Sequence, residues 1–278
     1  MVDIGSSTIE LERVSWPDIP GDGECAIVWL NRPAQLNAVN WEMLTAITEV
    51  LEELNDDPKI RSILISGRGR AFSAGGDLKG YVTLQRDPIA FPKFLDDFSG
   101  LVSRIRFLSK PVIALLNGIT AAGGLELMLG CDFAWAAESA TVGDAHLKYG
   151  QMAGAGSLAL LPRIIGPYRA RDLIFSARML SSSEALEWGL VTRVVPDDQL
   201  LAAGLEYAKD IVTRSSIAVA NVKYVINAGL ATGTGVDDAL RLERERAVSY
   251  CLTLPDSMEG ITAFVEKREP RFEGVSEK

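Results

Sequence analysis

Two glycine-containing stretches decide the fold of this chain. They read Ala71-Phe72-Ser73-Ala74-Gly75-Gly76-Asp77-Leu78-Lys79 and Asn117-Gly118-Ile119-Thr120-Ala121-Ala122-Gly123-Gly124-Leu125-Glu126-Leu127. A Gly-Gly pair lets the backbone adopt conformations closed to other residues and approach a ligand closely. The second pair also opens a predicted helix, whose first N–H groups point outward with partial positive charge. If the N–H groups of both loops converged on one oxygen, they would form an oxyanion hole.

Taken singly, each glycine pair favours a simple tight turn, because neither has the spacing of a dinucleotide-binding or P-loop motif. Their setting carries more weight. Each loop follows a short apolar run typical of a buried strand, residues 61–66 and 111–116, and helical patterns come after both. The order strand, strand, helix recurs along the chain. Glycine loops at the carboxyl ends of strands stand where open α/β layers bind ligands.

The rest of the pattern predicts an α/β core followed by helices. Residues 7–14 and 24–31 favour strands, whereas residues 40–54, with Asn40 as N-cap, and 90–108 favour amphipathic helices. Strand-like runs end near Pro196. Helical patterns then fill residues 197–213, 216–229, 236–251 and 256–268. We therefore predict a core over residues 1–195 and a helical region over residues 196–278.

Composition excludes several classes of protein. The chain has 278 residues, 47% hydrophobic and 23% charged, which is ordinary for a globular protein. A net charge of −9 argues against a nucleic-acid partner, which would need clustered Lys and Arg. Three scattered cysteines favour a reducing compartment. The N-terminus lacks the pattern of a signal peptide, and the longest apolar stretch is too short to span a bilayer. We expect a cytoplasmic protein with no membrane partner.

The two opening stretches resemble motifs of the crotonase (enoyl-CoA hydratase/isomerase) superfamily. So do Asn31-Arg32-Pro33-Ala34-Gln35-Leu36-Asn37-Ala38-Val39-Asn40 and the tail Glu259-Gly260-Ile261-Thr262-Ala263-Phe264-Val265-Glu266-Lys267-Arg268. The motifs stand in the expected order over nearly the whole chain. The resemblance implies an α/β fold, a spiral of ββα units with a C-terminal helical trimerisation region. It also implies a homotrimer or a dimer of trimers.

The resemblance further implies where a coenzyme A thioester binds. Gly76 and Gly123 would donate their N–H groups to the thioester carbonyl. The residues expected to line the CoA channel are Gln35, Leu36, Ala38, Ala74, Gly75, Asp77 and Leu78. Phe264 and Lys267 match tail positions that complete the CoA pocket of a neighbouring subunit, although Lys267 on its own is equally well a solvated helix lysine. CoA would arrive as part of the substrate, with no metal and no prosthetic group.

An enolate enzyme also needs an acid or base near the α- or β-carbon. Glu126, on the first turn of the second loop's helix, matches the first catalytic glutamate of the hydratases; its simpler role would be to satisfy the helix dipole. The second hydratase glutamate falls 20 residues later, where this chain has His146, its only histidine. A lone histidine is usually structural, but here it could hold a water or relay a proton. Asp144 is a candidate to orient it.

The leading hypothesis is therefore a lyase that adds water to a 2-enoyl-CoA, with Glu126 as main acid/base and His146 assisting. An isomerase needs only one such group and is the first alternative. A hydrolase of carbon–carbon bonds is weakened because that activity relies on an acidic residue where this chain has Ala155. A crotonase-fold protein that binds acyl-CoA or RNA without catalysis is a further alternative, disfavoured by the acidic composition and by the retained Glu126.

Overall fold

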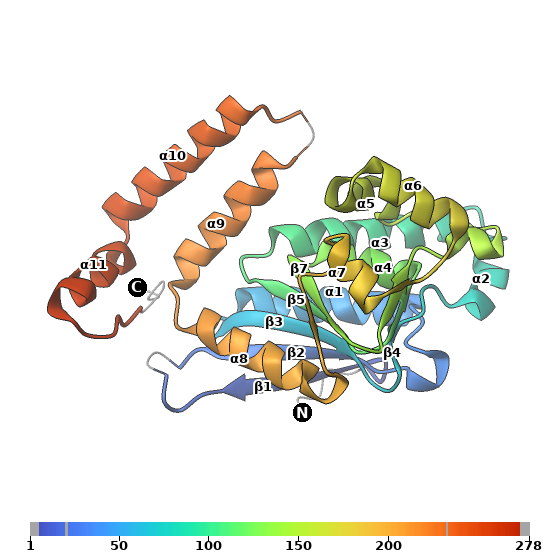
Figure 1. Ribbon diagram of the computed structural model, residues 1–278, viewed down its shortest axis with the longest axis horizontal. Helices are drawn as coiled ribbons and strands as arrows, with labels where there is room; N and C mark the ends of the chain where they lie inside the picture. The colour runs from blue at the N-terminus through green and yellow to red at the C-terminus, as the bar shows by residue number, and fades with distance from the viewer. Residues whose placement is uncertain (1–5, 20–21, 232, 273–278) are drawn as a thin grey trace.

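A layered α/β core carries a projecting arm of helices (Figure 1). The computed structural model describes residues 6–19, 22–231 and 233–272. Within these residues the strands form a six-stranded sheet, in the order β1-β2-β3-β5-β7-β10, and a four-stranded sheet, in the order β4-β6-β8-β9. The strands are β1 (Ile9–Ser15), β2 (Glu24–Leu30), β3 (Ile60–Gly67), β4 (Ala71–Ser73), β5 (Val112–Leu116), β6 (Ile119–Ala121), β7 (Phe133–Ala137), β8 (Thr141–Gly143), β9 (Leu180–Ser181) and β10 (Arg193–Val195).

The two sheets grow together as the chain advances. Each turn places one strand in the large sheet and the next in the small one: β3 then β4, β5 then β6, β7 then β8. Within each sheet these strands run parallel to their neighbours, whereas β1 with β2 and β8 with β9 pair antiparallel. The predicted repeat of two strands and a helix is thereby confirmed as a spiral of ββα units.

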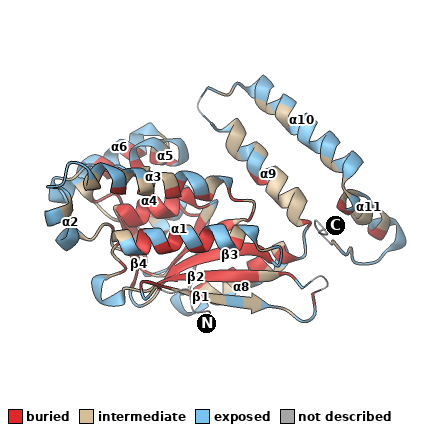
Figure 2. Ribbon diagram, turned by 180° about the vertical axis from the view of Figure 1, so that it is seen from behind, coloured by how far each residue is buried: buried red, intermediate tan, exposed pale blue. Residues whose placement is uncertain are grey.

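Helices cover the large sheet on both sides. Figures 1 and 2, seen from opposite directions, show α8 on one side of the sheet and α1 on the other. The core helices are α1 (Trp41–Asp56), α2 (Leu78–Leu84), α3 (Ala90–Phe107), α4 (Gly123–Gly130), α5 (Ser157–Ile165), α6 (Pro167–Ser176), α7 (Ser182–Glu187) and α8 (Leu200–Val212). Asn40 caps α1 as predicted, because its side chain accepts a hydrogen bond from the N–H of Met43.

Burial follows from this layering. All eight residues of β3 are buried, as expected for a central parallel strand covered on both faces. All eight residues of α4 are buried too, including the charged Glu126. A helix that is apolar all round lies inside a core. The carboxylate of Glu126 is the one charged group on α4, and because burying a charge is costly, its position calls for a functional explanation.

The arm consists of α9 (Ser216–Gly229), α10 (Val236–Thr253) and α11 (Pro255–Glu266). No residue that the structure describes on α10 is buried, as the pale colour of this helix in Figure 2 shows. One ion pair that ties the arm to the core joins the buried ammonium of Lys223 to Asp132 Oδ2, at 2.8 Å. The first helix after Pro196, α8, packs on β2 and β3, so the projecting part begins only with α9.

Two segments predicted as loops contain regular structure. The glycine-rich segment 67–80 includes β4 and the start of α2, and the small-residue segment before Gly123 includes β6. Three-residue strands are too short to show the alternation of apolar and polar residues that marks a strand, so the sequence pattern did not predict them. Both are central to the site, because they aim the glycine loops.

Candidate active site

The two glycine loops meet because β4 and β6 are parallel neighbours in the small sheet. Ala71 pairs with Ile119 and Ser73 with Thr120, so both loops leave the sheet from the same edge. A methyl group added to Cα of Gly123 would lie only 3.4 Å from the nitrogen of Gly76. The structure therefore brings together the two backbone groups that the sequence singled out.

The N–H of Gly76 is turned toward the second loop by a short parallel bridge with Val39. Val39 donates to the carbonyl of Gly75 (2.7 Å) and accepts from the N–H of Asp77 (3.0 Å). This bridge uses the groups on either side of Gly76 and leaves its own N–H facing away. Gly123 is the first residue of α4, where a helix leaves its N–H groups without intrahelical partners. Both donors are thus free of the bonds that would occupy them.

The other glycine of each pair makes room. Gly75 has a φ of +107°, a region that favours glycine, and a methyl there would lie 2.8 Å from Cβ of Ala122. Gly124 lies against the neighbouring strand, since a methyl there would lie 2.2 Å from the carbonyl oxygen of Ser73. Ala122 itself has a φ of +49° and a ψ of −118°, a sparsely populated conformation for alanine. Strain of this kind concentrates where a site needs a specific backbone direction.

Glu126 presents one carboxylate oxygen to the protein and the other to the cavity. Its Oε1 accepts hydrogen bonds from the N–H groups of Ala155 (2.7 Å) and Ser157 (3.2 Å). Burial raises the pKa of Glu126 above the usual glutamate range, against the opposing influence of His146 and of these two N–H groups. A carboxylate with a raised pKa beside a cavity is suited to taking up a proton.

His146 is held by Asp144 on one side and faces Glu126 on the other. Nδ1 of His146 lies 3.1 Å from Asp144 Oδ1, and Nε2 lies 3.7 Å from Glu126 Oε2. Burial alone would lower the pKa of His146, but the hydrogen bond and charge of Asp144 outweigh it and raise the pKa. Ala145 takes a left-handed conformation between the two residues, and His146 opens a short 3-10 helix. This turn, rather than strand alternation, puts both side chains together.

Asp144 is buried beside Ser157. Asp144 is 1% exposed and Ser157 is fully buried. Burial alone would raise the pKa of Asp144, but the hydrogen bond and charge of His146, and then the hydroxyl of Ser157, lower it. Asp144 therefore stays ionised beside His146.

A cavity of about 710 Å³ opens in front of these groups. Its lining joins Gly76, Gly123, Glu126 and His146 in one space. Most of the predicted channel residues line it as well: Gln35, Leu36, Ala38, Ala74, Asp77 and Leu78. Gly75, which was also predicted to line the channel, is not part of the cavity wall. It lies against Ala122, where a larger residue would not fit.

Phe264 and Lys267 do not reach this cavity within the chain. Phe264 lies on α11 with 84% of its surface exposed, and Lys267 follows that helix in a left-handed conformation. Figure 1 shows α11 at the far end of the arm, away from α2 and α4. If they contribute to a pocket, it is that of another subunit, as the resemblance implies.

Asp77 lines the cavity but has structural duties too. Its side chain caps α2 by accepting from the N–H of Gly80, and it forms an ion pair with Arg32 at 2.8 Å. Arg32 in turn donates to the carbonyl of Ala38. These bonds fix the loop 31–40 against the first glycine loop, so Asp77 shapes the channel by holding its two sides together.

Sequence reasoning missed three kinds of site residue. Tyr81 on α2 lines the cavity next to Gly76, and an aromatic residue on a short helix carries no signal of that. The backbone N–H groups that hold Glu126 are invisible in side-chain patterns. Three cations also line the cavity, and they lie far apart in the sequence: Arg70, Lys79 and Lys148.

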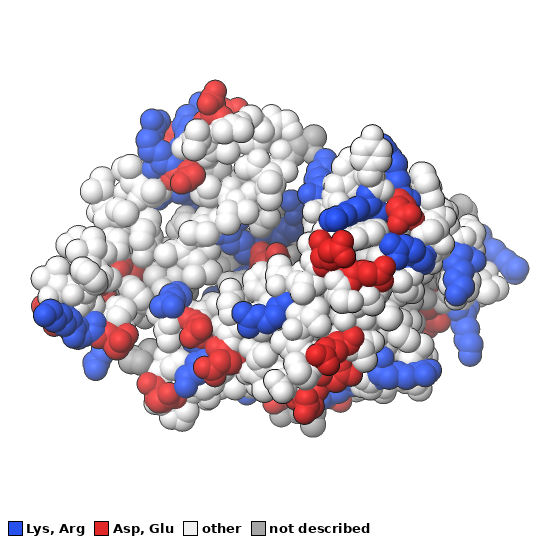
Figure 3. Space-filling view, viewed as in Figure 1, with Lys and Arg blue, Asp and Glu red and all other residues white. Residues whose placement is uncertain are grey.

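Three features of the described residues bear on other kinds of site. They contain no cluster of three His, Cys, Asp or Glu side chains that could hold a metal ion. No helix among them is both long and apolar enough to cross a bilayer. On the face seen in Figure 3, Lys and Arg lie among Asp and Glu instead of forming a continuous basic stripe.

Comparison with known proteins agrees with this geometry. The family model for enoyl-CoA hydratase/isomerase matches residues 22–275. A probable enoyl-CoA hydratase of Mycobacterium bovis is 36% identical over 251 residues, covering 90% of this chain and 95% of the relative. A crotonyl-CoA hydratase of Syntrophomonas wolfei is 34% identical, covering 89% of this chain and 94% of the relative. The chain belongs to the enoyl-CoA hydratase/isomerase family, the crotonase superfamily.

Solved structures give the same answer for the fold. The crystal structure of an enoyl-CoA hydratase from Bacillus anthracis is similar with a TM-score of 0.86 at 33% sequence identity, covering 95% of this chain and 99% of that one. The predicted crotonase-type α/β fold is thereby confirmed. The roles of individual residues rest on the geometry above.

Proposed function

We propose that this enzyme adds water across the double bond of a 2-enoyl-CoA thioester. The observation that carries the proposal is the buried Glu126 carboxylate, which shares one cavity with the N–H groups of Gly76 and Gly123 and with His146. The names of the hydratase relatives support the same reaction. Hydration needs a base for water, an acid for carbon and a site for the enolate, and each has a candidate here.

In the first half of the reaction, water attacks the β-carbon while Glu126 takes one of its protons. The π electrons of the double bond move toward the thioester, and negative charge develops on the carbonyl oxygen. The N–H groups of Gly76 and Gly123 stabilise that charge. Each donor of an oxyanion hole contributes roughly 3 kcal/mol to the transition state.

In the second half, the enolate collapses and the α-carbon receives a proton. We assign this proton to His146, because Asp144 favours its protonated form and its Nε2 faces the cavity beside Glu126. The proton that Glu126 took from water then passes to His146, directly or through a solvent water, which restores the carboxylate of Glu126 and the imidazolium of His146. Glutamate and imidazolium together carry no net charge, so a water placed between them meets an acceptor on one side and a donor on the other.

The CoA part of the substrate would lie along the predicted channel residues. Its phosphates need cations, and Arg70, Lys79 and Lys148 line the cavity. Phe264 and Lys267 of a neighbouring subunit would complete this pocket. CoA enters and leaves with the substrate, and we propose no metal and no prosthetic group. The three cysteines are unpaired in the described structure, which fits our proposal that the enzyme works in the cytoplasm.

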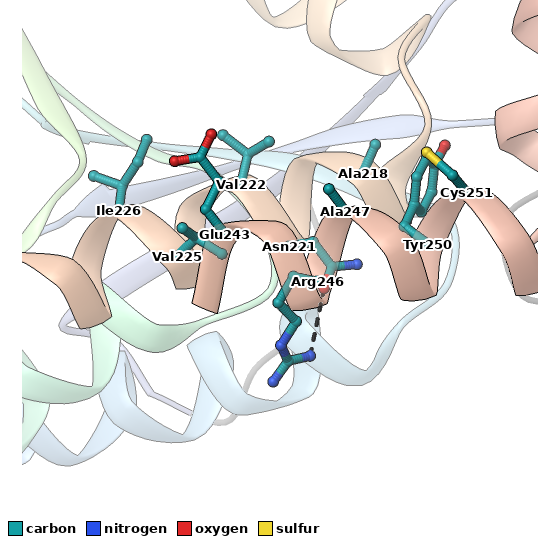
Figure 4. Close-up of a pocket in the computed structure, with 10 residues that line it drawn as sticks. All are labelled: Ala218, Asn221, Val222, Val225, Ile226, Glu243, Arg246, Ala247, Tyr250 and Cys251. Carbon is teal, nitrogen blue, oxygen red and sulfur yellow. Dashed lines mark hydrogen bonds between the residues drawn. The ribbon is translucent and has the colours of Figure 1, made fainter. Parts of the chain in front are cut away.

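We also propose that the arm assembles the chain into a homotrimer or a dimer of trimers. Several large apolar residues on α10 and α11 are more than half exposed: Val236, Leu240, Val248, Leu252, Met258, Ile261, Phe264 and Val265. Between α9 and α10 lies a groove of about 460 Å³, lined by apolar side chains together with Asn221, Glu243 and Arg246 (Figure 4). Exposed apolar surface of this extent is typical of an interface. Sedimentation equilibrium should give a multiple of three 30.1-kDa chains; a monomer would contradict the assembly.

An isomerase is the second candidate, and the observation that favours it is that a histidine, His146, stands beside Glu126 in place of a second glutamate. One carboxylate suffices to move a proton between two carbons. A carbon–carbon hydrolase receives less support. Ala155 offers only a methyl group and its N–H, and the latter is engaged with Glu126.

The test is a panel of 2-enoyl-CoA and 3-enoyl-CoA esters of different length with the wild type, Glu126→Gln and His146→Ala. Loss of the conjugated thioester absorbance reports hydration of 2-enoyl esters, and its gain reports isomerisation of 3-enoyl esters. We expect hydration by the wild type and a drop of at least about 10²-fold in Glu126→Gln. If no ester reacts above background, or if Glu126→Gln equals the wild type, the proposal is wrong.

A further inference from the structure

The side chain of Tyr81 is fixed at the wall of the cavity. Its ring packs edge-on against Phe91, with centroids 6.1 Å apart, and against Phe94, with centroids 5.6 Å apart. Phe94 is fully buried and itself packs against Trp41 and Phe98. Aromatic pairs of this geometry are stabilising, so the ring has little freedom to turn its hydroxyl elsewhere.

The hydroxyl of Tyr81 lies beside the oxyanion hole and is unused. A methyl group added to Gly76 would lie 2.7 Å from it, which places the hydroxyl next to one of the two N–H donors. Tyr81 lines the same cavity as Glu126. Among the described residues, no atom accepts a hydrogen bond from this hydroxyl. The hydroxyl oxygen is accessible from the cavity, where a bound molecule can replace water as its hydrogen-bond partner.

The hydroxyl can only act as a neutral donor or acceptor. Burial, and then the charges of Glu126 and Asp77, raise the pKa of Tyr81 above that of free tyrosine. A neutral phenol of this kind can donate a hydrogen bond to an uncharged oxygen.

We propose that Tyr81 binds an uncharged oxygen of the acyl group, so that the natural substrate is an acyl thioester with a hydroxyl, ether or carbonyl oxygen beyond the thioester carbonyl. The surrounding wall is apolar, formed by Phe91, Leu95, Phe98 and Met152. A purely aliphatic chain would fill that wall but would strip water from the Tyr81 hydroxyl without replacing its hydrogen bond. Sites built to bind an oxygen reject the analogue that lacks it.

This inference rests on the proposed function in taking a 2-enoyl-CoA as substrate, and matched pairs of esters test it. In each pair a terminal hydroxyl replaces a methyl: 4-hydroxybut-2-enoyl against pent-2-enoyl, 5-hydroxypent-2-enoyl against hex-2-enoyl, and 6-hydroxyhex-2-enoyl against hept-2-enoyl. We expect kcat/KM of the wild type to favour the hydroxylated member of at least one pair roughly tenfold. Tyr81→Phe keeps the ring packing and should remove that preference. Tyr168→Phe, an exposed tyrosine on α6 outside the cavity, is the control and should keep it.

A second measurement needs no turnover. The saturated esters 5-hydroxypentanoyl-CoA and hexanoyl-CoA, with their shorter and longer pairs, can be compared by calorimetry with wild type and Tyr81→Phe. A preference for the hydroxyl that disappears in Tyr81→Phe supports the inference even if no enoyl ester reacts, in which case only the proposed reaction fails. A wild type without preference in any pair overturns it. So does a Tyr81→Phe variant that loses activity equally on both members, because the hydroxyl would then serve the thioester oxygen.

Discussion

The two walls of the cavity are built in different ways. The glycine wall, residues 74–78 and 122–124, is held by close backbone packing: a methyl group at Gly124 would lie 2.2 Å from the carbonyl oxygen of Ser73, and one at Gly75 would lie 3.0 Å from that of Ala121. The histidine wall, Glu126 with residues 144–157, is held by a few hydrogen bonds of polar side chains: Glu126 accepts from the N–H groups of Ala155 and Ser157, and His146 pairs with Asp144. Both walls stand at the carboxyl edge of the small sheet, after β4 and β6 in one case and after β8 in the other.

This difference assigns the two walls different parts of the chemistry. The oxyanion donors must stay in place throughout the reaction, and a backbone locked by close packing provides that. The groups that move protons must change charge, and Glu126 and His146 do so through side-chain environments that shift their pKa values. We therefore expect substitutions in the glycine wall to act on folding or on all activity, and those in the histidine wall to act on rate and pH dependence.

The largest effect is expected from Gly124→Ala. The new methyl would lie 2.2 Å from the carbonyl oxygen of Ser73, an atom of β4 that cannot turn away. Displacing a buried strand from a buried helix costs about 4 kcal/mol or more. We expect little soluble protein, or a Tm lowered by roughly 10 °C in differential scanning calorimetry.

Gly100→Ala is the matched control for this prediction. Gly100 lies within α3, has no heavy atom within 4 Å of an added methyl, and adopts an ordinary helical conformation. Alanine is a better helix former than glycine by roughly 1 kcal/mol, so this variant should be at least as stable as the wild type. A Gly124→Ala protein as stable as Gly100→Ala would show that the glycine wall is not locked by packing.

Glu126→Gln should have the second-largest effect, on rate and not on folding. The glutamine oxygen can still accept from the N–H groups of Ala155 and Ser157, so the side chain keeps its place. It cannot take a proton from water. We expect kcat to fall by about 10²- to 10⁴-fold with an unchanged circular dichroism spectrum. Glu187→Gln, on α7 and away from the cavity, is the control; equal activity of the two variants would remove Glu126 from the mechanism.

The sequence predicted the glycine wall because its signals are local. Small residues at fixed spacing, an apolar strand before them and a helix start after them stand within about ten residues of one another. That Gly76 and Gly123 meet followed from the resemblance alone, and the parallel pairing of β4 with β6 that brings them together was not predicted. Nothing in the stretch 67–80 or before Gly123 marked a strand, since three residues cannot show alternation.

The histidine wall could be predicted only in outline. Its spacing from Glu126 pointed to His146, but the bonds that position Glu126 come from main-chain N–H groups of residues 155 and 157. Such donors are present at nearly every residue, so sequence cannot tell which of them will be used. Tyr81 was not predicted as a site residue for a related reason. Its neighbours in space, Phe91 and Phe94, lie on the next helix, so no spacing in the sequence relates them to Tyr81.

His146→Gln is expected to lower the rate less than Glu126→Gln. Glutamine can still hydrogen-bond near Asp144 but cannot deliver a proton to carbon, so that step would fall to solvent. We expect kcat to fall by about 10²-fold, the lower end for loss of an acid or base. Solvent hydrogen-isotope effects on kcat should rise in the variant as protonation becomes limiting. A fully active His146→Gln would mean that the histidine is structural and that both proton transfers belong to Glu126.

The smallest effect, and the one that separates the two walls most cleanly, is expected from Asp144→Asn. Glu126 and Asp144 are the charged groups that face His146 in the described structure, and both favour its protonated form. In the wild type, kcat/KM should therefore stay near its maximum up to a pH above the ordinary imidazole pKa of about 6.5. It should fall as the pH rises through the raised pKa of His146. The stabilisation of the fold by protonated His146 has the same sign, being present at low pH and lost as pH rises through that pKa.

Asparagine at position 144 keeps a hydrogen-bond acceptor for Nδ1 but removes the charge. The pKa of His146 should fall, so the basic limb of the profile should move to lower pH while the acidic limb, set by Glu126, moves much less. Near neutral pH the rate should drop about tenfold or less, and lowering the pH should recover part of it. NMR titration of His146, the only histidine in the chain, would give its pKa directly. If neither the basic limb nor the titration of His146 moved, the charge of Asp144 would have no effect on the pKa of His146. Asp144 would then have a packing role only, and the two walls would not differ in their dependence on charge.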